Sequence, residues 1–170
     1  IASDVDVTPS GNEQTFEGLY KKVTVEAGGN ATVDCSKIVE QNLQSLSNKQ
    51  RLFVGIITKL PEMDLSQVDT INQMFRYFYS LELIESIKLG NQTSIDGLLV
   101  GCWSLLEVPQ MDTRNVTMMG SLCYDCRKLK KVPLLECGNV IAINSIFDGA
   151  TLVEELGGFK DLGKAYTYQA

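Results

Sequence analysis

Residues 98–108 read LLVGCWSLLEV, and the same apolar spacing occurs 24 residues earlier in MFRYFYSLELI (74–84) and 24 residues later in LCYDCRKLKKV (122–132). When the three segments are aligned, apolar residues fall into common columns. One column continues beyond them in both directions and holds only aliphatic residues: Leu60, Ile84, Val108, Val132 and Leu156. A period of this length is typical of repeat proteins, in which each unit buries its apolar side against its neighbours.

The spacing inside one unit predicts a helical part followed by a short strand. Apolar residues three and four positions apart in the first half indicate a short α- or 3₁₀-helix that turns one side inward. The second half, as in LKKVPL (129–134), is typical of a strand. We therefore predict an α/β repeat solenoid of the leucine-rich-repeat type over residues 60–170, with units of about 24 residues and a C-terminal cap.

The residues before the repeats predict two further elements. Alternating segments at 4–8 and 22–26 indicate a small β element within residues 1–34, used for docking or attachment. Asp34 or Ser36 is expected to start a capping helix that runs through Leu46, so that residues 35–59 form the N-terminal cap and first turn. Because the β element is too short for a core of its own, we expect it to dock on the solenoid, on a neighbouring chain or on a second copy.

The composition narrows the possible functions. The 170 residues carry 15 basic and 21 acidic side chains, and a net charge of −6 argues against nucleic acid as a partner because phosphate contacts need Lys and Arg. The chain has no histidine, which removes most zinc hydrolases and the Ser-His-Asp and Cys-His enzymes. No apolar run approaches the length of about 18 residues that a membrane span needs, so we expect no membrane insertion.

The five cysteines could suggest a metal or redox site, but their columns indicate packing instead. Cys102 and Cys126 share a column with Phe78, and Cys123 shares one with Phe75. A column that accepts Phe belongs to a core, where free Cys behaves as a small apolar residue. We therefore expect five free thiols, no metal and no cofactor.

One column outside the predicted core carries residues that are typical of binding surfaces. Tyr79, Trp103 and Arg127 occupy the same position in three successive units, and we predict that they form one exposed row. Aromatic residues and Arg are enriched at the energetic centres of interfaces. Glu107 and Lys131, which share a strand column, complete the predicted binding residues. The alternative is that the row only covers the boundary between units.

The sequence resembles known families in two places. The string LLVGCWSLLEVPQMDTRNVTMM (98–119) is similar to BspA-like leucine-rich repeats, and this resemblance covers roughly residues 50–165. The string TPSGNEQTFEGLYKKVTV (8–25) resembles short modules of tailed-phage virion proteins. Proteins with such repeats are displayed on bacterial surfaces or occur in phage particles, so the resemblance implies a virion or bacterial cell-surface location.

These observations favour a non-enzymatic recognition or structural module. We expect a phage virion protein of the tail, fibre or capsid-decorating kind that binds a host surface or a neighbouring virion protein, with a protein or a glycan as partner. A bacterial cell-surface adhesin with leucine-rich repeats is the alternative. A glycan-acting enzyme is the remaining possibility, and it would need two carboxyl groups facing one cleft, one of them with a raised pKa.

Overall fold

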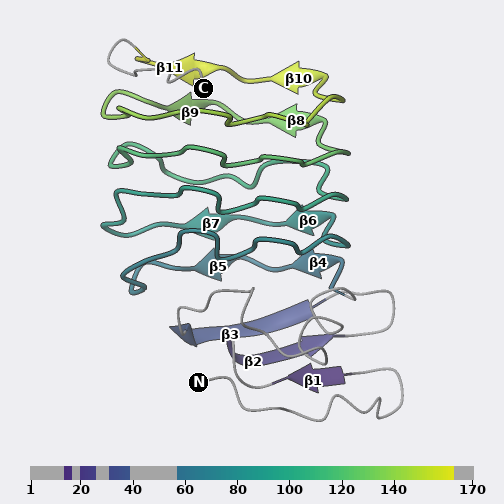
Figure 1. Ribbon diagram of the computed structural model, residues 1–170. Coiled ribbons are helices and arrows are strands. Elements are labelled where there is room, and N and C mark those ends of the chain that lie inside the picture. The colour runs from purple at the N-terminus through teal and green to yellow at the C-terminus, as the bar shows by residue number, and fades with distance from the viewer. Residues whose placement is uncertain (1–13, 17–19, 26–30, 39–56, 163–170) are drawn as a thin grey trace.

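The computed structural model describes residues 14–16, 20–25, 31–38 and 57–162, with side chains for residues 57–162. Within these residues the regular structure consists of short strands, which Figure 1 shows as a small N-terminal sheet followed by a column of stacked turns. The strands are β1 (Gln14–Phe16), β2 (Tyr20–Val25), β3 (Ala31–Ile38), β4 (Lys59–Leu60), β5 (Met63–Asp64), β6 (Leu83–Ile84), β7 (Ile87–Lys88), β8 (Lys131–Val132), β9 (Leu135–Glu136), β10 (Glu155–Leu156) and β11 (Phe159–Lys160).

The N-terminal sheet is antiparallel and has the order β1-β2-β3, with β3 nearest the stacked turns (Figure 1). Asp34 and Ser36, expected to start a capping helix, lie inside β3. That expectation is wrong because the alternating residues of 31–38 pair with β2, for example Val33 with Val23, and strand pairing overrides a local capping preference. The remainder of the expected helix, residues 39–46, lies outside the described residues, as does the predicted strand at 4–8.

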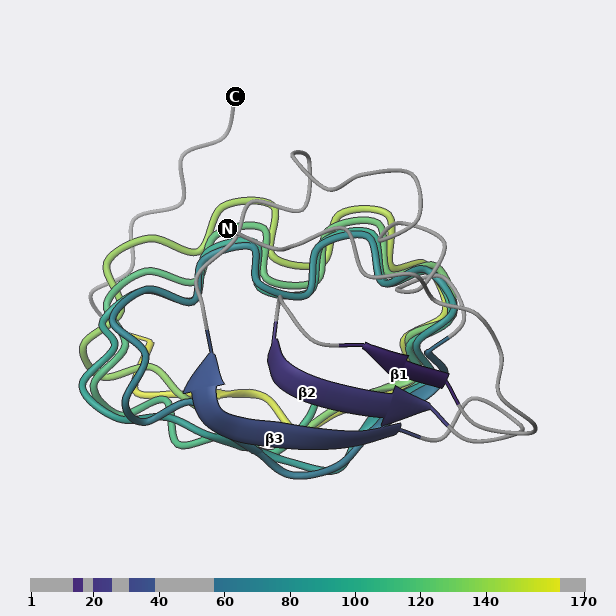
Figure 2. The ribbon, with the colours of Figure 1, turned by 90° about the horizontal axis from the view of Figure 1, so that it is seen from below.

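The stacked turns are joined by parallel pairs whose partners are 24 residues apart. Lys59 pairs with Leu83 and Met63 with Ile87 near the start, and Leu135 pairs with Phe159 near the end. Seen along the stack in Figure 2, successive turns follow the same outline. Two residues separate the two strand pieces of a turn, and in several turns one of them is a proline, which has no amide N–H to donate, as at Pro61 and Pro133.

The segments expected to be helical are series of turns. Gln73 and Tyr77 have φ values of 59° and 65°, and the residues in the same two columns of the later turns also have positive φ: Gly97, Gly101, Ser121, Asp125, Ser145 and Gly149. Left-handed residues interrupt a right-handed helix. The amides of Gln73 and Tyr77 instead donate to Asp96 and Val100 of the next turn, at 3.0 and 2.8 Å.

The predicted α/β leucine-rich-repeat solenoid with a capping helix is therefore wrong. The described residues contain no helix, and their regular structure is limited to short paired strands. The apolar residues that suggested a helix, such as Phe75 and Phe78, are buried all the same. They reach the core from turns whose alternate amides bond to the neighbouring turn, which spacing alone does not distinguish from a helix.

The core lies inside the stack and is built from columns of like residues. Leu81, Leu105 and Leu129 form one fully buried column, and the aliphatic column from Leu60 to Val132 is buried as well. Leu156, the last member of the aliphatic column, is 56% exposed because no described turn follows it. These inward columns hold the outward side chains of successive turns in line with one another.

Candidate functional site

The structure brings the predicted row of Tyr79, Trp103 and Arg127 together on the outside of the stack. The ring centroids of Tyr79 and Trp103 are 5.9 Å apart, and the guanidinium carbon of Arg127 lies 4.5 Å from the centre of the Trp103 ring. Tyr79 and Trp103 are 39% and 40% exposed. Since the three residues come from three successive turns, the turn-to-turn register is what places them in contact.

Asp125 holds this row in place and was missed by the sequence analysis. Its carboxylate accepts hydrogen bonds from Trp103 Nε1 at 2.9 Å and from Arg127 Nε and Nη2 at 2.9 and 3.1 Å. The bonds from Arg127, and secondarily from Trp103, lower the pKa of Asp125. Its φ of 58° is one that Asp tolerates better than most residues, and its position two residues before Arg127 is the signal that could have revealed it.

Tyr77 and Arg76 extend the exposed surface beside the row. Arg76 Nη2 donates to the Tyr77 hydroxyl at 2.9 Å, and Nη1 donates to Gln73 Oε1 at 2.6 Å. The Tyr77 ring lies over Gly101, where an added Cβ would come within 2.5 Å of a ring carbon. Gly101 therefore gives the ring the space to lie flat across the neighbouring turn.

Arg76 has no carboxylate partner among the described residues. Its two side-chain hydrogen bonds go to an amide oxygen and a hydroxyl, and its Nε is buried without a hydrogen-bond acceptor in the described part of the chain. Arg127 differs, because Asp125 balances its charge. Within residues 57–162, this guanidinium therefore has hydrogen-bond partners but no charge partner.

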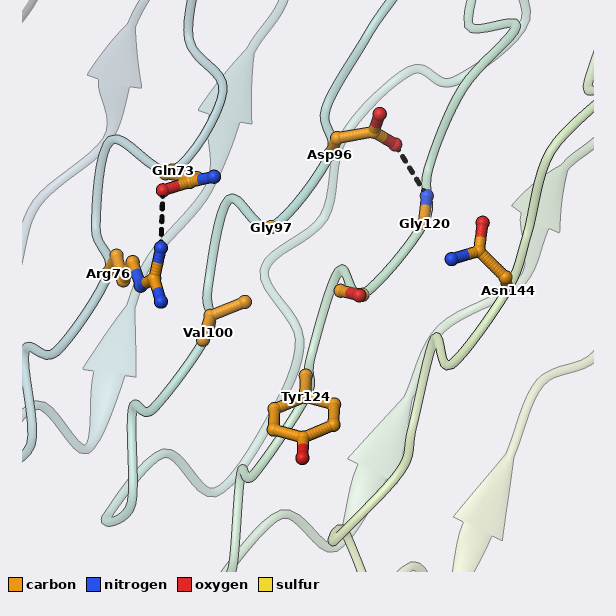
Figure 3. A pocket seen from close by; sticks show the side chains of 9 residues that line it. Gln73, Arg76, Asp96, Gly97, Val100, Gly120, Tyr124 and Asn144 are labelled. Atoms are coloured by element: carbon orange, nitrogen blue, oxygen red, sulfur yellow. Dashed lines mark hydrogen bonds between the residues drawn. The ribbon is translucent and has the colours of Figure 1, made fainter. Parts of the chain in front are cut away.

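A shallow groove of about 310 Å³ lies next to Arg76 and crosses four turns (Figure 3). Its lining residues are Gln73, Arg76, Asp96, Gly97, Val100, Gly120, Ser121, Tyr124 and Asn144. Tyr124 is 43% exposed and stands on one side of the groove, while Asp96 Oδ1 accepts a hydrogen bond from the Gly120 amide at 2.6 Å. Asp96 is thus the one carboxyl among these lining residues.

We call Arg76, Tyr77, Tyr79, Trp103, Tyr124 and Arg127 together the aromatic–arginine surface. All the tyrosines within residues 57–162, and the single tryptophan of the chain, belong to it. The sequence predicted half of it, the row of Tyr79, Trp103 and Arg127 in one column. Of the other three, Arg76 and Tyr124 share the column three positions earlier, and Tyr77 lies in the next column. The shared column of Arg76 and Tyr124 was the available signal.

The structure does not join Glu107 and Lys131 to this surface. Glu107 and Lys131 pair with each other in a parallel β-bridge between two neighbouring turns. Lys131 Nζ also lies 3.2 Å from Glu155 Oε1 in the following turn. They belong to the strand columns, where charged side chains pair along the stack. Their membership of the binding site remains a prediction that no contact in the structure supports.

The cysteines of the described turns are buried in the core as free thiols. Cys102 and Cys126 each donate from Sγ to a carbonyl oxygen of the preceding turn, Phe75 O at 3.2 Å and Leu99 O at 3.1 Å. Burial raises the pKa of Cys102 and Cys123 well above the ordinary value of a thiol. Within residues 57–162 no group of three or more Cys, Asp or Glu side chains is arranged to hold a metal ion. The side chain of Cys35 lies outside the described residues.

The described residues include no helix of the length and apolar character that crossing a membrane requires. Comparisons of the chain with protein-family models, with curated proteins and with solved structures find no match.

Proposed function

We propose that this protein is a non-enzymatic recognition module that binds another protein through the aromatic–arginine surface. The observation that carries the proposal is the row of Tyr79, Trp103 and Arg127, whose side chains are exposed yet held in fixed positions by one another and by Asp125. Tyr, Trp and Arg are the residue types that dominate binding energy at protein interfaces. Side chains that are fixed before binding lose less conformational entropy when the partner arrives.

The arrangement of Trp103 favours a protein over a sugar as the partner. Tyr79 belongs to the turn before Trp103 and Arg127 to the turn after it, so the indole lies between a phenol ring and a guanidinium of its own chain. A sugar would stack on an open ring face, whereas here the ring offers its edge. An edge together with neighbouring polar groups suits the packed centre of a protein–protein contact.

The charge of Arg76 specifies one feature of the partner. Because no described carboxylate balances this guanidinium, an Asp or Glu side chain of the partner would form a charge-assisted hydrogen bond there. The surrounding Tyr77 and Tyr124 rings would shield that bond from water. We therefore expect the bound segment to be acidic, with an apolar or aromatic residue against the Trp103 edge.

A glycan-acting enzyme receives less support. Such an enzyme needs two carboxyl groups facing one cleft, and the groove has Asp96 alone among its lining residues. The described carboxyl groups with shifted pKa values, Asp64, Asp112 and Asp125, all have lowered rather than raised values. The resemblance of residues 8–25 to virion modules supports a phage particle as the setting of the interaction, with a bacterial surface adhesin as the alternative.

A random peptide library displayed on particles tests the proposal even though the partner has no name. Peptides selected on the intact protein should be enriched in Asp or Glu. They should bind the Trp103→Ala variant at least about thirtyfold more weakly, which corresponds to about 2 kcal/mol at an energetic centre. Arg76→Gln should weaken the binding of acidic peptides more than the binding of peptides without Asp or Glu.

Ile141→Ala is the matched control, because Ile141 is 52% exposed but lies outside the aromatic–arginine surface. Binding should be unchanged in this variant. Selected peptides that bind Trp103→Ala and Arg76→Gln as well as the parent protein would refute the proposed surface. Binding to a glycan array that is lost in Trp103→Ala, with no peptide selected, would assign the surface to a glycan instead.

A further inference from the structure

The stack of described turns ends in an open strand edge. β10 and β11 form its last turn, and Figure 1 shows no described strand beyond them. Leu156 in this turn is 56% exposed, although the other four members of its column, from Leu60 to Val132, are buried. The edge thus presents an apolar side chain that the fold elsewhere covers with a further turn.

The backbone of this last turn also presents unused hydrogen-bonding groups. Where the following turn has no proline at the donor position, the carbonyl of the aliphatic column accepts a bond from that turn, as Val132 O does from Gly157 N at 2.7 Å. The amide three residues later donates to the following turn, as Leu135 N does to Gly158 O at 3.0 Å. The corresponding groups of the last turn are Leu156 O and Phe159 N, and no described residue bonds to them. Exposed strand edges of this kind pair readily with another strand.

The sequence of this edge, ELGGFK (155–160), is complementary to itself when two copies run antiparallel. With a two-fold axis between Gly157 and Gly158, Glu155 lies opposite Lys160 of the second copy, and Leu156 lies opposite Phe159. Each pairing occurs twice, as a symmetric interface requires. Opposite charges and apolar pairs directly across antiparallel strands are favourable, so residues 155–160 support this register, while Glu154 opposite Asp161 marks the outer limit of the pairing.

The side chains also face the correct way for this pairing. In the turn before, the residues in the columns of Leu156 and Phe159 are the buried Val132 and Leu135, so Leu156 and Phe159 would extend the core across the interface. Glu155 and Lys160 point outward, where they already contact Lys131 at 3.2 Å and Glu136 at 3.1 Å. A carboxylate and an ammonium each have room for a second partner.

The centre of the edge is open enough for a second backbone to approach. An added Cβ on Gly158 would meet nothing within 4 Å. Two glycines at a two-fold axis allow close contact because neither strand brings a side chain there.

We propose that this protein forms a symmetric dimer in which the β10–β11 edges of two copies pair antiparallel through residues 155–160. This interface is separate from the aromatic–arginine surface and does not depend on the function assigned to it. It would place the two copies end to end, so that the dimer carries two such surfaces related by a two-fold axis.

Sedimentation velocity over a range of concentrations tests the dimer with the intact chain. The parent protein should associate into dimers. Glu155→Lys should raise the dimer dissociation constant about tenfold or more, because it places two Lys–Lys pairs in the interface. The double variant Glu155→Lys/Lys160→Glu should restore association, since the swapped charges again face opposite charges.

A disulfide trap tests the register directly. Residues 155 and 160 of different copies form a close pair in the proposed sheet, within the Cα separation that a disulfide spans. Glu155→Cys/Lys160→Cys should therefore yield a covalent dimer on mild oxidation. Lys131→Cys/Glu136→Cys is the matched control, since it occupies the same columns one turn earlier, where the following turn already pairs, and it should stay uncrosslinked.

Three results would overturn the proposal. A parent protein that stays monomeric at all concentrations would assign the edge to another occupant, such as residues 163–170 of the same chain. A dimer that tolerates Glu155→Lys would place the interface elsewhere, for example at the N-terminal sheet. Equal crosslinking of the two cysteine pairs would remove the evidence for the register.

Discussion

Replacement of Ser145 by glycine should stabilise this protein, although the sequence around Ser145 is spaced like a helix. Ser145 has a φ of 52°, and its column contains Gln73, Gly97 and Ser121, all with positive φ. Its side chain is exposed, so a substitution changes little besides the backbone. Whether glycine raises or lowers the free energy of unfolding therefore depends on whether this segment is left-handed or helical in solution.

The magnitude follows from the two backbone states. A residue with a Cβ in the left-handed region costs about 1–2 kcal/mol, which glycine avoids. The greater freedom of glycine in the unfolded chain offsets about 0.5–1 kcal/mol of that gain. Ser145→Gly should thus be more stable than Ser145→Ala by about 0.5–1 kcal/mol. In a helix the order would reverse, and glycine would be about 1 kcal/mol less stable than alanine.

Urea unfolding of the two variants measures this difference, since Ser145→Ala loses the same hydroxyl as Ser145→Gly but keeps the Cβ. Gly149→Ala provides the opposite test four residues later. Gly149 has a φ of 80°, and an added Cβ would lie 3.1 Å from Asp125 Cα, so this variant should be destabilised. A Ser145→Ala protein more stable than Ser145→Gly would refute the turn structure and return the segment to a helix.

Further measurements test the core, the charged columns and the thiols. Val108→Asp should destabilise the protein by several kcal/mol because it buries an unpaired charge in a fully buried column, and thermal unfolding no lower than that of Val108→Ala would contradict this packing. The hydrogen bond from Lys88 at 2.8 Å, followed by those from Ser66, lowers the pKa of Asp64 to about 2, so this contribution to stability is present above about pH 4 and is lost as the pH falls toward 2. An NMR titration of the Asp64 carboxyl should show its pKa rising in Lys88→Met, and an unchanged value would mean that the pair does not form. Thiol titration should count five free thiols in the denatured, unreduced protein, whereas the four buried cysteines of residues 57–162 should react slowly in the native state; a count of three would indicate a disulfide.

The sequence was sufficient for the period and the inward columns because burial selects residue type in every turn. Leu81, Leu105 and Leu129 occupy one such column, and all three are fully buried. The row of Tyr79 and Trp103 could be found for the same reason: once the period is known, residues of one column must lie in line. These inferences need only the spacing of side chains along the chain.

The backbone between the columns could not be found in this way. Apolar residues at 71, 74, 75 and 78 fit a helix and also fit the observed turns, because both bury the same side. The helix and the observed turns differ in the left-handed backbone at Gln73 and Tyr77, and neither Gln nor Tyr is a residue type that indicates positive φ. The glycines at 97, 101 and 149 in those columns were the available signal, since glycine is the residue that adopts such φ values without cost.

Asp125 and Arg76 were missed for a different reason: their roles depend on contacts between turns at unequal column positions. Trp103 Nε1 reaches Asp125 across 22 residues rather than 24, and Arg76 acts through its neighbour Tyr77. An alignment of columns cannot show such diagonal contacts. The place of Asp125 two residues before Arg127 hints at one of them, but the contacts between turns appear only when the side chains are placed in space.

Under the proposed function, stability and recognition would be carried by different columns of the same turns. The buried columns fix how each turn sits on the next, while exposed pairs such as Lys88–Asp64 add little to stability because water screens them. The core therefore does not require any particular residue type in the exposed column of Tyr79, Trp103 and Arg127. Large aromatic and basic side chains can occupy it, and the register set by the core holds them in contact, which is the condition that a fixed binding surface requires.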